Sequence, residues 1–287
     1  MCIRDRGLGI PVTSSFHTQF HAYGRHYGLG PLQRVGLAYL RWLHHGTRRT
    51  YVPSSTALDL LRVAGFRDLA VLGRGVDTDL FRPDRRDPEL RRAWGASDDT
   101  PVLLHVGRLA AEKNLDVVLR TAEAVRADRP GTILVLVGDG PMRADLERRA
   151  PWARFAGACH GEDLARHYAS GDLFLFPSTT ETFGNVVTEA LASGLLVLGY
   201  DYAATREHVE SGVNGIAVPF DRTSAFIHAA RVWMSFVDIW PEIRVRARET
   251  AIGLTWSSVA AAWLEDLRAV LRESGAPSPV RALERVS

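Results

Sequence analysis

Lys113 is the only lysine among the 35 lysine and arginine residues of this 287-residue chain. It lies in "GRLAAEKN" (107–114), directly after the apolar run "PVLLHVG" (101–107). An arginine side chain forks onto two oxygens, whereas the lysine ammonium is a compact charge that can enter a narrow space between phosphates. Gly107 permits a ligand to approach the backbone closely. Arg108 and Lys113 therefore indicate a diphosphate-binding loop, with a solvated surface lysine as the alternative.

Two carboxylates and a helix start stand close together in "PSTTETFGNVVTEALASG" (177–194). The first N–H groups of a helix have no intrahelical partner and attract anions. Here these groups belong to Gly184, Asn185 and Val186. Glu181 and Glu189 do not suit a phosphate, so we expect them to bind hydroxyl groups of the molecule that carries it. The alternatives are an acidic helix start for Glu181 and a surface position for Glu189.

The region from residue 101 onward alternates short apolar runs with amphipathic stretches. Strands buried on both faces and separated by helices are typical of a parallel, doubly wound sheet. Strands are predicted within 101–107, 132–140, 153–159, 172–178, 195–201 and 215–220, and helices within 114–128, 141–150, 161–170 and 185–194. This pattern predicts a complete Rossmann-like domain at 100–253 that binds its ligand outside the carboxyl ends of the strands.

Residues 1–75 have the pattern of the last units of a second α/β domain. Strands are expected in "GIPVTSSFHT", "YVPSS" and "LAVLGRGV", with helices in "PLQRVGLAYLRWLHHGTRRT" and "STALDLLRVAG" between them. No opening strand with a glycine-rich turn precedes these elements. We therefore predict a partial N-terminal Rossmann-like domain in an N-terminally truncated chain.

Three further segments complete the predicted organisation. Residues 76–99 are rich in charge and proline and are expected to connect the domains, which makes "DTD" (77–79) structural rather than a metal motif. Residues 254–274 are predicted to form an amphipathic helix, capped by Ser257, that crosses back to the N-terminal domain. Residues 275–287 are predicted to be a tail.

Composition excludes several classes of protein. No apolar run approaches the roughly 18 residues of a membrane span, and the region typical of a signal peptide is absent. Cys2 and Cys159 are too few for a disulfide framework, so we expect a cytoplasmic protein. Residues 1–50 carry seven arginines against one acid, a net charge of +6 where the whole chain has +2. This asymmetry favours an anionic partner for the N-terminal part.

The basic helix expected near residues 31–50 is a candidate surface for that partner. Arginines alternate there with large apolar residues, which suits an anionic lipid surface. The same residues would also pack a helix onto a missing half-domain and leave the arginines in water. The arginines are Arg34, Arg41, Arg48 and Arg49, and the apolar residues are Leu37, Tyr39, Leu40, Trp42 and Leu43. We expect peripheral contact with the inner face of a membrane and no nucleic acid partner, because the rest of the chain is acidic.

"GRLAAEK" and "ETFGNVVTE", with Glu181 and Glu189 in an E-x7-E spacing, resemble the retaining GT-B glycosyltransferases of family 4. "GRGVDTDLF", "LVLVGDGP", "YASGDLFLFPS" and "ALASGLLVL" match as well, and the likeness covers residues 12–272. The segment "SSFHTQFHAYGRHYG" is similar to that of glycolipid mannosyl- and sulfoquinovosyl-transferases. The resemblance implies an α/β fold of GT-B type. The family's N-terminal glycine-rich loop is absent, and "YAATREHVESGVNG" lacks its usual glycine pair.

Carried over to the matching positions, the resemblance implies a role for each candidate residue. Arg108 and Lys113 would hold the donor diphosphate, and Glu181 the hydroxyls of the donor sugar. Glu189 would bind the ribose hydroxyls, and His17 would face the donor sugar from the N-terminal domain. The implied donor-binding residues are Gly107, Arg108, Lys113, Glu181, Phe183, Gly184, Asn185, Val186 and Glu189. The implied catalytic residues are His17, Arg108, Lys113 and Glu181.

The resemblance also implies the reaction. We expect a hexosyltransferase of EC 2.4 type that moves mannose from GDP-mannose to a lipid-linked or polyprenyl-type acceptor with retention, in glycolipid biosynthesis. The leaving phosphate would help to deprotonate the acceptor hydroxyl, and the cations would stabilise the charge on the diphosphate, so no metal or cofactor is expected. The alternatives are a UDP-sugar-dependent transferase with another acceptor and a nucleotide-sugar-binding fragment that is inactive alone. Tyr23, His26 and Tyr27 could line an acceptor cleft or pack on a core.

Overall fold

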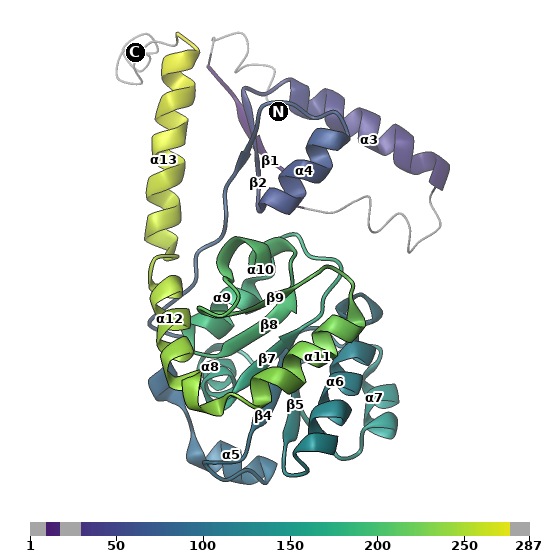
Figure 1. Ribbon diagram of the computed structural model, residues 1–287. Coiled ribbons are helices and arrows are strands. Elements are labelled where there is room, and N and C mark those ends of the chain that lie inside the picture. The colour runs from purple at the N-terminus through teal and green to yellow at the C-terminus, as the bar shows by residue number, and fades with distance from the viewer. Residues whose placement is uncertain (1–9, 18–29, 276–287) are drawn as a thin grey trace. The chain divides into compact units, whose positions relative to one another are not determined.

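The computed structural model describes residues 10–17 and 30–275 (Figure 1). The chain divides into two compact units. The smaller unit comprises residues 1–74 and 257–287, and the larger unit comprises residues 75–256. Among the described residues, no helix is long and apolar enough to cross a membrane.

A parallel three-stranded sheet in the order β1–β2–β3 forms the centre of the smaller unit. Thr50 lies opposite Ser14 on one side and opposite Leu69 on the other. The Ser54 hydroxyl caps the following helix by accepting the Ala57 N–H at 3.2 Å. The elements are β1 (Thr13–Ser15), α3 (Gly30–His45), β2 (Arg49–Val52), α4 (Ser55–Val63) and β3 (Leu69–Val71). Each overlaps the segment from which the sequence predicts it, but α3 ends at His45 and β2 already begins at Arg49, inside the segment predicted to be helix.

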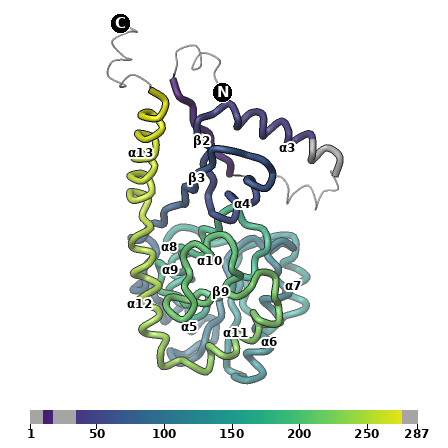
Figure 2. Tube along the Cα trace, turned by 45° about the horizontal axis from the view of Figure 1, so that its top comes forward, coloured from purple at the N-terminus to yellow at the C-terminus, as the bar shows by residue number. Residues whose placement is uncertain are grey.

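The two faces of this sheet bury different residues, as the period of two along a strand requires. Val52 packs with Phe16 and Phe66 in a core that also receives residues of α3 and α4. Tyr51 points to the other face, where its hydroxyl donates to Asp266 at 2.6 Å. Asp266 belongs to α13 (Trp256–Glu273), which Figure 2 shows as one unbroken helix. Burial and the Asp266 carboxylate raise the pKa of Tyr51 to about 12.

The predicted cap of the last helix, Ser257, is wrong. α13 begins at Trp256, so Ser257 lies inside its first turn. The reason is tertiary, because Val76 donates its N–H to the Leu254 carbonyl at 2.8 Å and forms a parallel bridge with Thr255. This pairing holds the chain extended immediately before Trp256, and the helix starts where the pairing ends.

Six parallel strands in the order β6–β5–β4–β7–β8–β9 form the sheet of the larger unit. They are β4 (Val102–Val106), β5 (Ile133–Val137), β6 (Arg154–Gly157), β7 (Leu173–Phe176), β8 (Leu196–Tyr200) and β9 (Gly215–Val218). Each lies within an apolar run from which the sequence predicts a strand. The chain enters the sheet at β4, builds one half through β5 and β6, and returns to β7 beside β4. This order is that of a Rossmann-like domain.

Helices cover both faces of this sheet (Figure 1). Leu104 and Phe174 pack on one face with residues of α8 and α9, whereas Leu103 and Leu134 pack on the other face with residues of α6 and α11. β4 therefore contributes alternate residues to two cores, and all five of its residues are buried. The helices are α6 (Leu115–Asp128), α7 (Arg143–Arg149), α8 (Gly161–Ser170), α9 (Asn185–Ala192), α10 (Ala203–His208), α11 (Thr223–Met234) and α12 (Trp240–Ile252), with short turns η2 (Ala111–Lys113) and η3 (Val237–Ile239).

Residues 76–99, predicted to be a connection, pack onto the larger unit. They contain η1 (Pro83–Arg85) and α5 (Pro88–Trp94) and bury Phe81 and Trp94 in its core. Asp172, directly before β7, receives hydrogen bonds from Arg86 at 2.9 Å, Arg91 at 3.2 Å and Arg244 at 3.2 Å. Because Asp172 and Arg91 are both buried, this cluster holds charges that water does not solvate.

Candidate active site

The carboxyl ends of β4 and β7 lie where the strand order reverses. β4 is the first strand of the larger unit and β7 is the fourth, yet they are neighbours, with Leu103 opposite Leu173. In open α/β sheets, ligands bind outside the carboxyl ends of the strands at such a point. The loop after β4 carries Arg108 and Lys113, and the loop after β7 carries Glu181. The fold therefore brings the two sequence motifs to one place.

Glycines let the loop after β4 lie directly on the loop after β5. Gly107 donates its N–H to the Val137 carbonyl at 3.0 Å, and Gly138 has a φ of +135°. A Cβ on Gly138 would lie only 2.0 Å from the Gly107 oxygen. Leu109 donates in the same way to the Asp139 carbonyl, at 2.9 Å. The backbone around Arg108 is thus fixed by its neighbours, and only the side chains need to adapt to a ligand.

Lys113 forms an ion pair with Glu181, which is 68 residues away in the sequence. Both side chains are largely buried, with 19% and 11% of their surface exposed. The Ser178 hydroxyl donates to the same carboxylate oxygen at 2.8 Å, and the Tyr202 hydroxyl donates to the Glu181 carbonyl at 3.2 Å. The sequence did not single out Ser178 or Tyr202. Ser178 lies in the quoted loop, directly after the predicted strand, and this position is the signal that could have found it.

Arg108 pairs with Glu112 on its own loop. Although burial acts in the opposite direction, Arg108 and Lys113 together lower the pKa of Glu112, which is therefore ionised at neutral pH. The Arg108 side chain is 61% exposed, and ion pairs this exposed contribute little free energy. The pair with Glu112 therefore does little to oppose an exchange of this carboxylate for an anionic ligand.

The helix after β7 begins at the predicted residue. α9 starts at Asn185, and Gly184 before it has a φ of +98°, a conformation that other residues rarely adopt. A Cβ on Gly184 would also press on the Phe176 ring at 3.3 Å. Phe183 is 1% exposed, and its carbonyl accepts the Ala204 N–H at 2.8 Å. The Phe183 side chain therefore anchors the loop, and the N–H groups of the first turn of α9, Val186 included, are the atoms suited to an anion.

Glu189 lies just over one turn into α9 and accepts a hydrogen bond from the Tyr168 hydroxyl at 2.8 Å. Tyr168 is fully buried on α8. Burial raises the pKa of Glu189, and the hydrogen bond from Tyr168 offsets only part of this effect. The alternative of a surface position for Glu189 is therefore wrong. A carboxylate with one hydroxyl partner keeps the capacity to accept hydrogen bonds from a ligand's hydroxyl groups.

His105 lies under the loop that carries Arg108, and the sequence reasoning missed it. The residue is fully buried, and its Nδ1 is 2.9 Å from the Leu175 carbonyl. A carbonyl can only accept, so Nδ1 carries the proton and Nε2 is an acceptor, one without a protein partner in the structure. A Cβ on Gly107 would lie 3.6 Å from Nε2, which shows how closely the ring approaches the loop. Burial, assisted by Lys113, lowers the pKa of His105 to about 4. A histidine inside an otherwise apolar strand is the signal that could have found it.

His17 belongs to the smaller unit, where it is exposed just after the carboxyl end of β1. Loss of hydration, followed by the charge of Arg74, lowers its pKa, so the imidazole is neutral at pH 7. Tyr23, His26 and Tyr27, considered above for an acceptor cleft, lie outside the described residues.

Two groups of side chains have the composition of a possible metal site. Cys159, Asp163 and His167 place possible ligand atoms within 4.8 Å of one another. Burial, together with Asp163, raises the pKa of the Cys159 thiol to about 12, which opposes the thiolate that a metal requires. In "DTD", Asp77 accepts the N–H groups of the residues two and three positions later, at 3.0 and 2.9 Å, which is the geometry of a turn.

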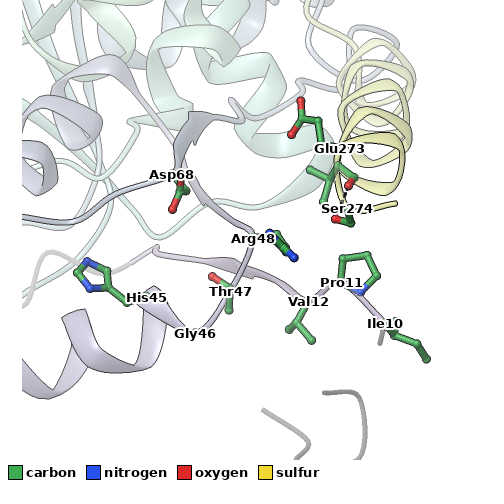
Figure 3. Close-up of a pocket in the computed structure, with 11 residues that line it drawn as sticks. Ile10, Pro11, Val12, His45, Gly46, Thr47, Arg48, Asp68, Glu273 and Ser274 are labelled. Atoms are coloured by element: carbon green, nitrogen blue, oxygen red, sulfur yellow. Dashed lines mark hydrogen bonds between the residues drawn. The ribbon is translucent and has the colours of Figure 1, made fainter. Parts of the chain in front are cut away.

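A hollow of about 540 Å³ opens in the smaller unit (Figure 3). It lies at the amino ends of β1, β2 and β3, beside the end of α13. Its lining includes Val12, His45, Arg48, Asp68 and Glu273. Ligands of parallel sheets bind at the carboxyl ends of the strands, so this hollow does not coincide with the predicted site.

Comparison with known families identifies both regions in which the motifs occur. Residues 100–235 match the family model "Glycosyl transferases group 1", and residues 2–80 match "Glycosyltransferase Family 4". A GDP-mannose-dependent alpha-mannosyltransferase of Mycolicibacterium smegmatis is 35% identical over 266 residues, which make up 93% of this chain and 69% of that protein. The chain belongs to glycosyltransferase family 4.

Further similarities of this family 4 chain concern function and fold. A GDP-mannose-dependent alpha-(1-6)-phosphatidylinositol dimannoside mannosyltransferase of Mycobacterium tuberculosis is 34% identical over 68% of this chain and 51% of that protein. The crystal structure of Anabaena Alr3699/HepE in complex with UDP superposes with a TM-score of 0.78 at 20% identity, over 93% of this chain and 74% of that one. The expected α/β fold of GT-B type is thus confirmed. The chain spans 62%, 69% and 55% of the length of three GDP-mannose-dependent alpha-mannosyltransferases.

Proposed function

We propose that this chain binds a nucleoside diphosphate sugar at the switch point between β4 and β7 and transfers its hexose with retention of configuration. The observation that carries the proposal is the ion pair between Lys113 and Glu181. An ammonium suits the diphosphate, and a carboxylate suits the sugar hydroxyls. A sugar linked to a diphosphate needs these two groups side by side, and here they are in contact.

Donor binding would exchange the partners of the charged side chains. Lys113 and Arg108 would release their carboxylates and take phosphate oxygens, while the N–H groups of the first turn of α9 hold the distal phosphate. The freed Glu181 would accept hydrogen bonds from the sugar, and Glu189 from the ribose. Negative charge that develops on the leaving diphosphate would then lie among fixed cations and N–H dipoles, which stabilises the transition state.

We further infer that the donor is GDP-mannose and that the acceptor is linked to a lipid. The support is the similarity to GDP-mannose-dependent mannosyltransferases, one of which is named for phosphatidylinositol dimannoside. The leaving phosphate would accept the proton of the acceptor hydroxyl on the face from which it departs.

Thermal unfolding with GDP, GDP-mannose, UDP and UDP-glucose tests the donor site. A ligand at 100 times its dissociation constant adds about 2.7 kcal/mol of stability, which raises the melting temperature by several degrees. We expect guanine nucleotides to stabilise the wild type and to have no effect on Lys113→Ala. The matched control is Arg120→Ala, because Arg120 is an exposed cation on α6 and should leave the response unchanged.

Glu181→Gln separates sugar binding from phosphate binding. The substitution frees Lys113 from its carboxylate, so we expect GDP to bind this variant at least as tightly as the wild type. GDP-mannose should lose its advantage over GDP, because an amide accepts sugar hydroxyls less strongly than a carboxylate does. Stabilisation by UDP and UDP-glucose instead would contradict the guanine assignment. Equal stabilisation of the wild type and Lys113→Ala by every nucleotide would contradict the site itself.

A further inference from the structure

Tyr168 lies against the inner side of the Glu189 carboxylate. It is the first residue of the motif "YASGDLFLFPS" and belongs to α8. The side chain is fully buried, and its ring meets the Phe81 ring edge to face at 5.6 Å and the Phe174 ring at 5.8 Å. Phe81 lies in the segment before β4, and Phe174 belongs to β7. Three separate segments of the larger unit therefore fix the position of the Tyr168 hydroxyl.

This hydroxyl is a hydrogen-bond donor. Burial, followed by the negative charge of Glu189, raises the pKa of Tyr168 well above its usual value, so the phenol keeps its proton. An ionised carboxylate can only accept, and Oε2 of Glu189 accepts this hydrogen bond over 2.8 Å. A hydrogen bond to a charged acceptor is stronger than one between neutral groups. Burial raises the pKa of Glu189, and the bond from Tyr168 opposes that shift, so it favours the ionised acceptor.

Glu189 lies between the Tyr168 hydroxyl and the outside of the protein. The residue is half-buried, whereas Tyr168 has no exposed surface. Among the residues that the structure describes, Tyr168 is the one hydrogen-bond partner of this carboxylate, and it occupies Oε2. Oε1 and the second lone pair of Oε2 can still accept hydrogen bonds from hydroxyl groups of a ligand. The terminal torsion of a glutamate is broad, so the bond from Tyr168 is what fixes the plane of the carboxylate.

We propose that Tyr168 is a positioning residue that, through Glu189, makes the nucleotide site prefer a ribonucleotide over its deoxyribose analogue. This inference rests on the proposed function, in which Glu189 binds the ribose hydroxyls. Because the carboxylate is already held from the core side, it loses little rotational freedom when two neighbouring hydroxyls bind to it. Tyr168 is screened from the ligand by Glu189. Removal of its hydroxyl should therefore weaken recognition of the ribose and leave the contacts of the base and the diphosphate in place.

Isothermal titration calorimetry with GDP and deoxy-GDP tests the proposal, since deoxy-GDP lacks one ribose hydroxyl. UDP and deoxy-UDP form a second pair and cover the case in which the site takes uridine nucleotides. We expect the wild type to bind the ribonucleotide at least about tenfold more tightly, because its analogue loses a hydrogen bond to a charged group. Tyr168→Phe keeps the ring between Phe81 and Phe174 and should lower this preference by at least about threefold.

Two further variants separate positioning from a general loss of stability. Tyr51→Phe is the matched control, because the buried Tyr51 also donates its hydroxyl to a carboxylate, that of Asp266, but in the smaller unit. It should leave the preference for the ribonucleotide unchanged. Glu189→Leu removes the carboxylate through which Tyr168 acts. In that background, Tyr168→Phe should have no further effect on the preference.

A weaker donor at the same position keeps the test decisive if Tyr168→Phe does not fold. Para-aminophenylalanine has the size of tyrosine, and its neutral amine is a weaker donor than a phenol, so it should give an intermediate preference. The proposal is overturned if the preference is unchanged in Tyr168→Phe or in the para-aminophenylalanine variant, if Tyr51→Phe lowers it equally, or if Tyr168→Phe lowers it further in the Glu189→Leu background. A wild type that binds nucleotides without preference would overturn it and leave the donor site standing, whereas a wild type that binds no nucleotide would overturn the proposed function as well.

Discussion

His105 offers a quantitative test of how the site is built. The fully buried ring is held in its neutral form, with a pKa of about 4 against 6.5 in an unfolded chain. At a pH between these two pKa values, His105 binds a proton in the unfolded chain but not in the folded chain. The contribution of His105 to stability is therefore complete above about pH 6.5 and is lost as the pH falls toward 4.

The size of this loss follows from the two pKa values. A difference of about 2.5 units corresponds to about 3 kcal/mol once the pH is below both values. Between pH 7 and pH 5, the same two values give a loss of about 2 kcal/mol. Burial also lowers the pKa values of His44 and His208, so both also contribute to the pH dependence of stability. A wild-type measurement alone would therefore mix several contributions.

The substitution His105→Asn isolates the contribution of His105 to the pH dependence of stability. The asparagine amide can replace the Nδ1–H donor toward the Leu175 carbonyl, and it does not titrate. We expect denaturant unfolding to show that the wild type loses about 2 kcal/mol more than the variant between pH 7 and pH 5. Nitrogen-15 NMR of labelled histidine should show the Nδ1–H tautomer down to about pH 4. Equal pH dependence of the two proteins, or a ring that titrates near 6.5, would refute the reasoning.

Three further predictions concern glycine packing and buried charge. Gly138→Ala should lower the unfolding free energy, measured by denaturant unfolding, by about 3 kcal/mol or more, because the new Cβ would lie 2.0 Å from a backbone oxygen. Gly131→Ala is the control, and it should change the unfolding free energy by less than about 1 kcal/mol because Gly131 has open space around it. Glu189→Gln should raise the melting temperature at pH 7, because burial raises the pKa of the Glu189 carboxyl and so disfavours its charged form. The contribution of Glu189 to stability is complete at low pH and is lost as the pH rises, so an equal gain in melting temperature at low pH would contradict this reasoning. Asp172→Asn should cost about 3 to 5 kcal/mol by calorimetry, because it leaves buried guanidinium groups without their carboxylate, whereas Asp201→Asn at an exposed pair should cost less than about 1 kcal/mol.

The local elements of the larger unit could be predicted because each carries its own signal. Apolar runs of a few residues, bounded by glycine and polar residues, identify strands whichever neighbours they later acquire. α9 is a second example, since Gly184 before Asn185 marks its start in the sequence and in the structure. The cap of α13 failed for the opposite reason. Pairing between Val76 and Thr255, far apart in the chain, decides where that helix begins.

The sequence by itself determined which residues are candidates for the chemistry, because a lone lysine, a glycine-rich loop and paired carboxylates are visible without a fold. Only the tertiary structure decided that Lys113 meets Glu181, since the strand order places β4 beside β7 although three crossovers separate them along the chain. It also decided that His105 lies beneath the loop, and that Trp42 faces water while Leu40 faces the core. Local patterns report how a residue's own segment folds, whereas partners across a sheet follow from the packing of the whole chain, which no short stretch of sequence contains.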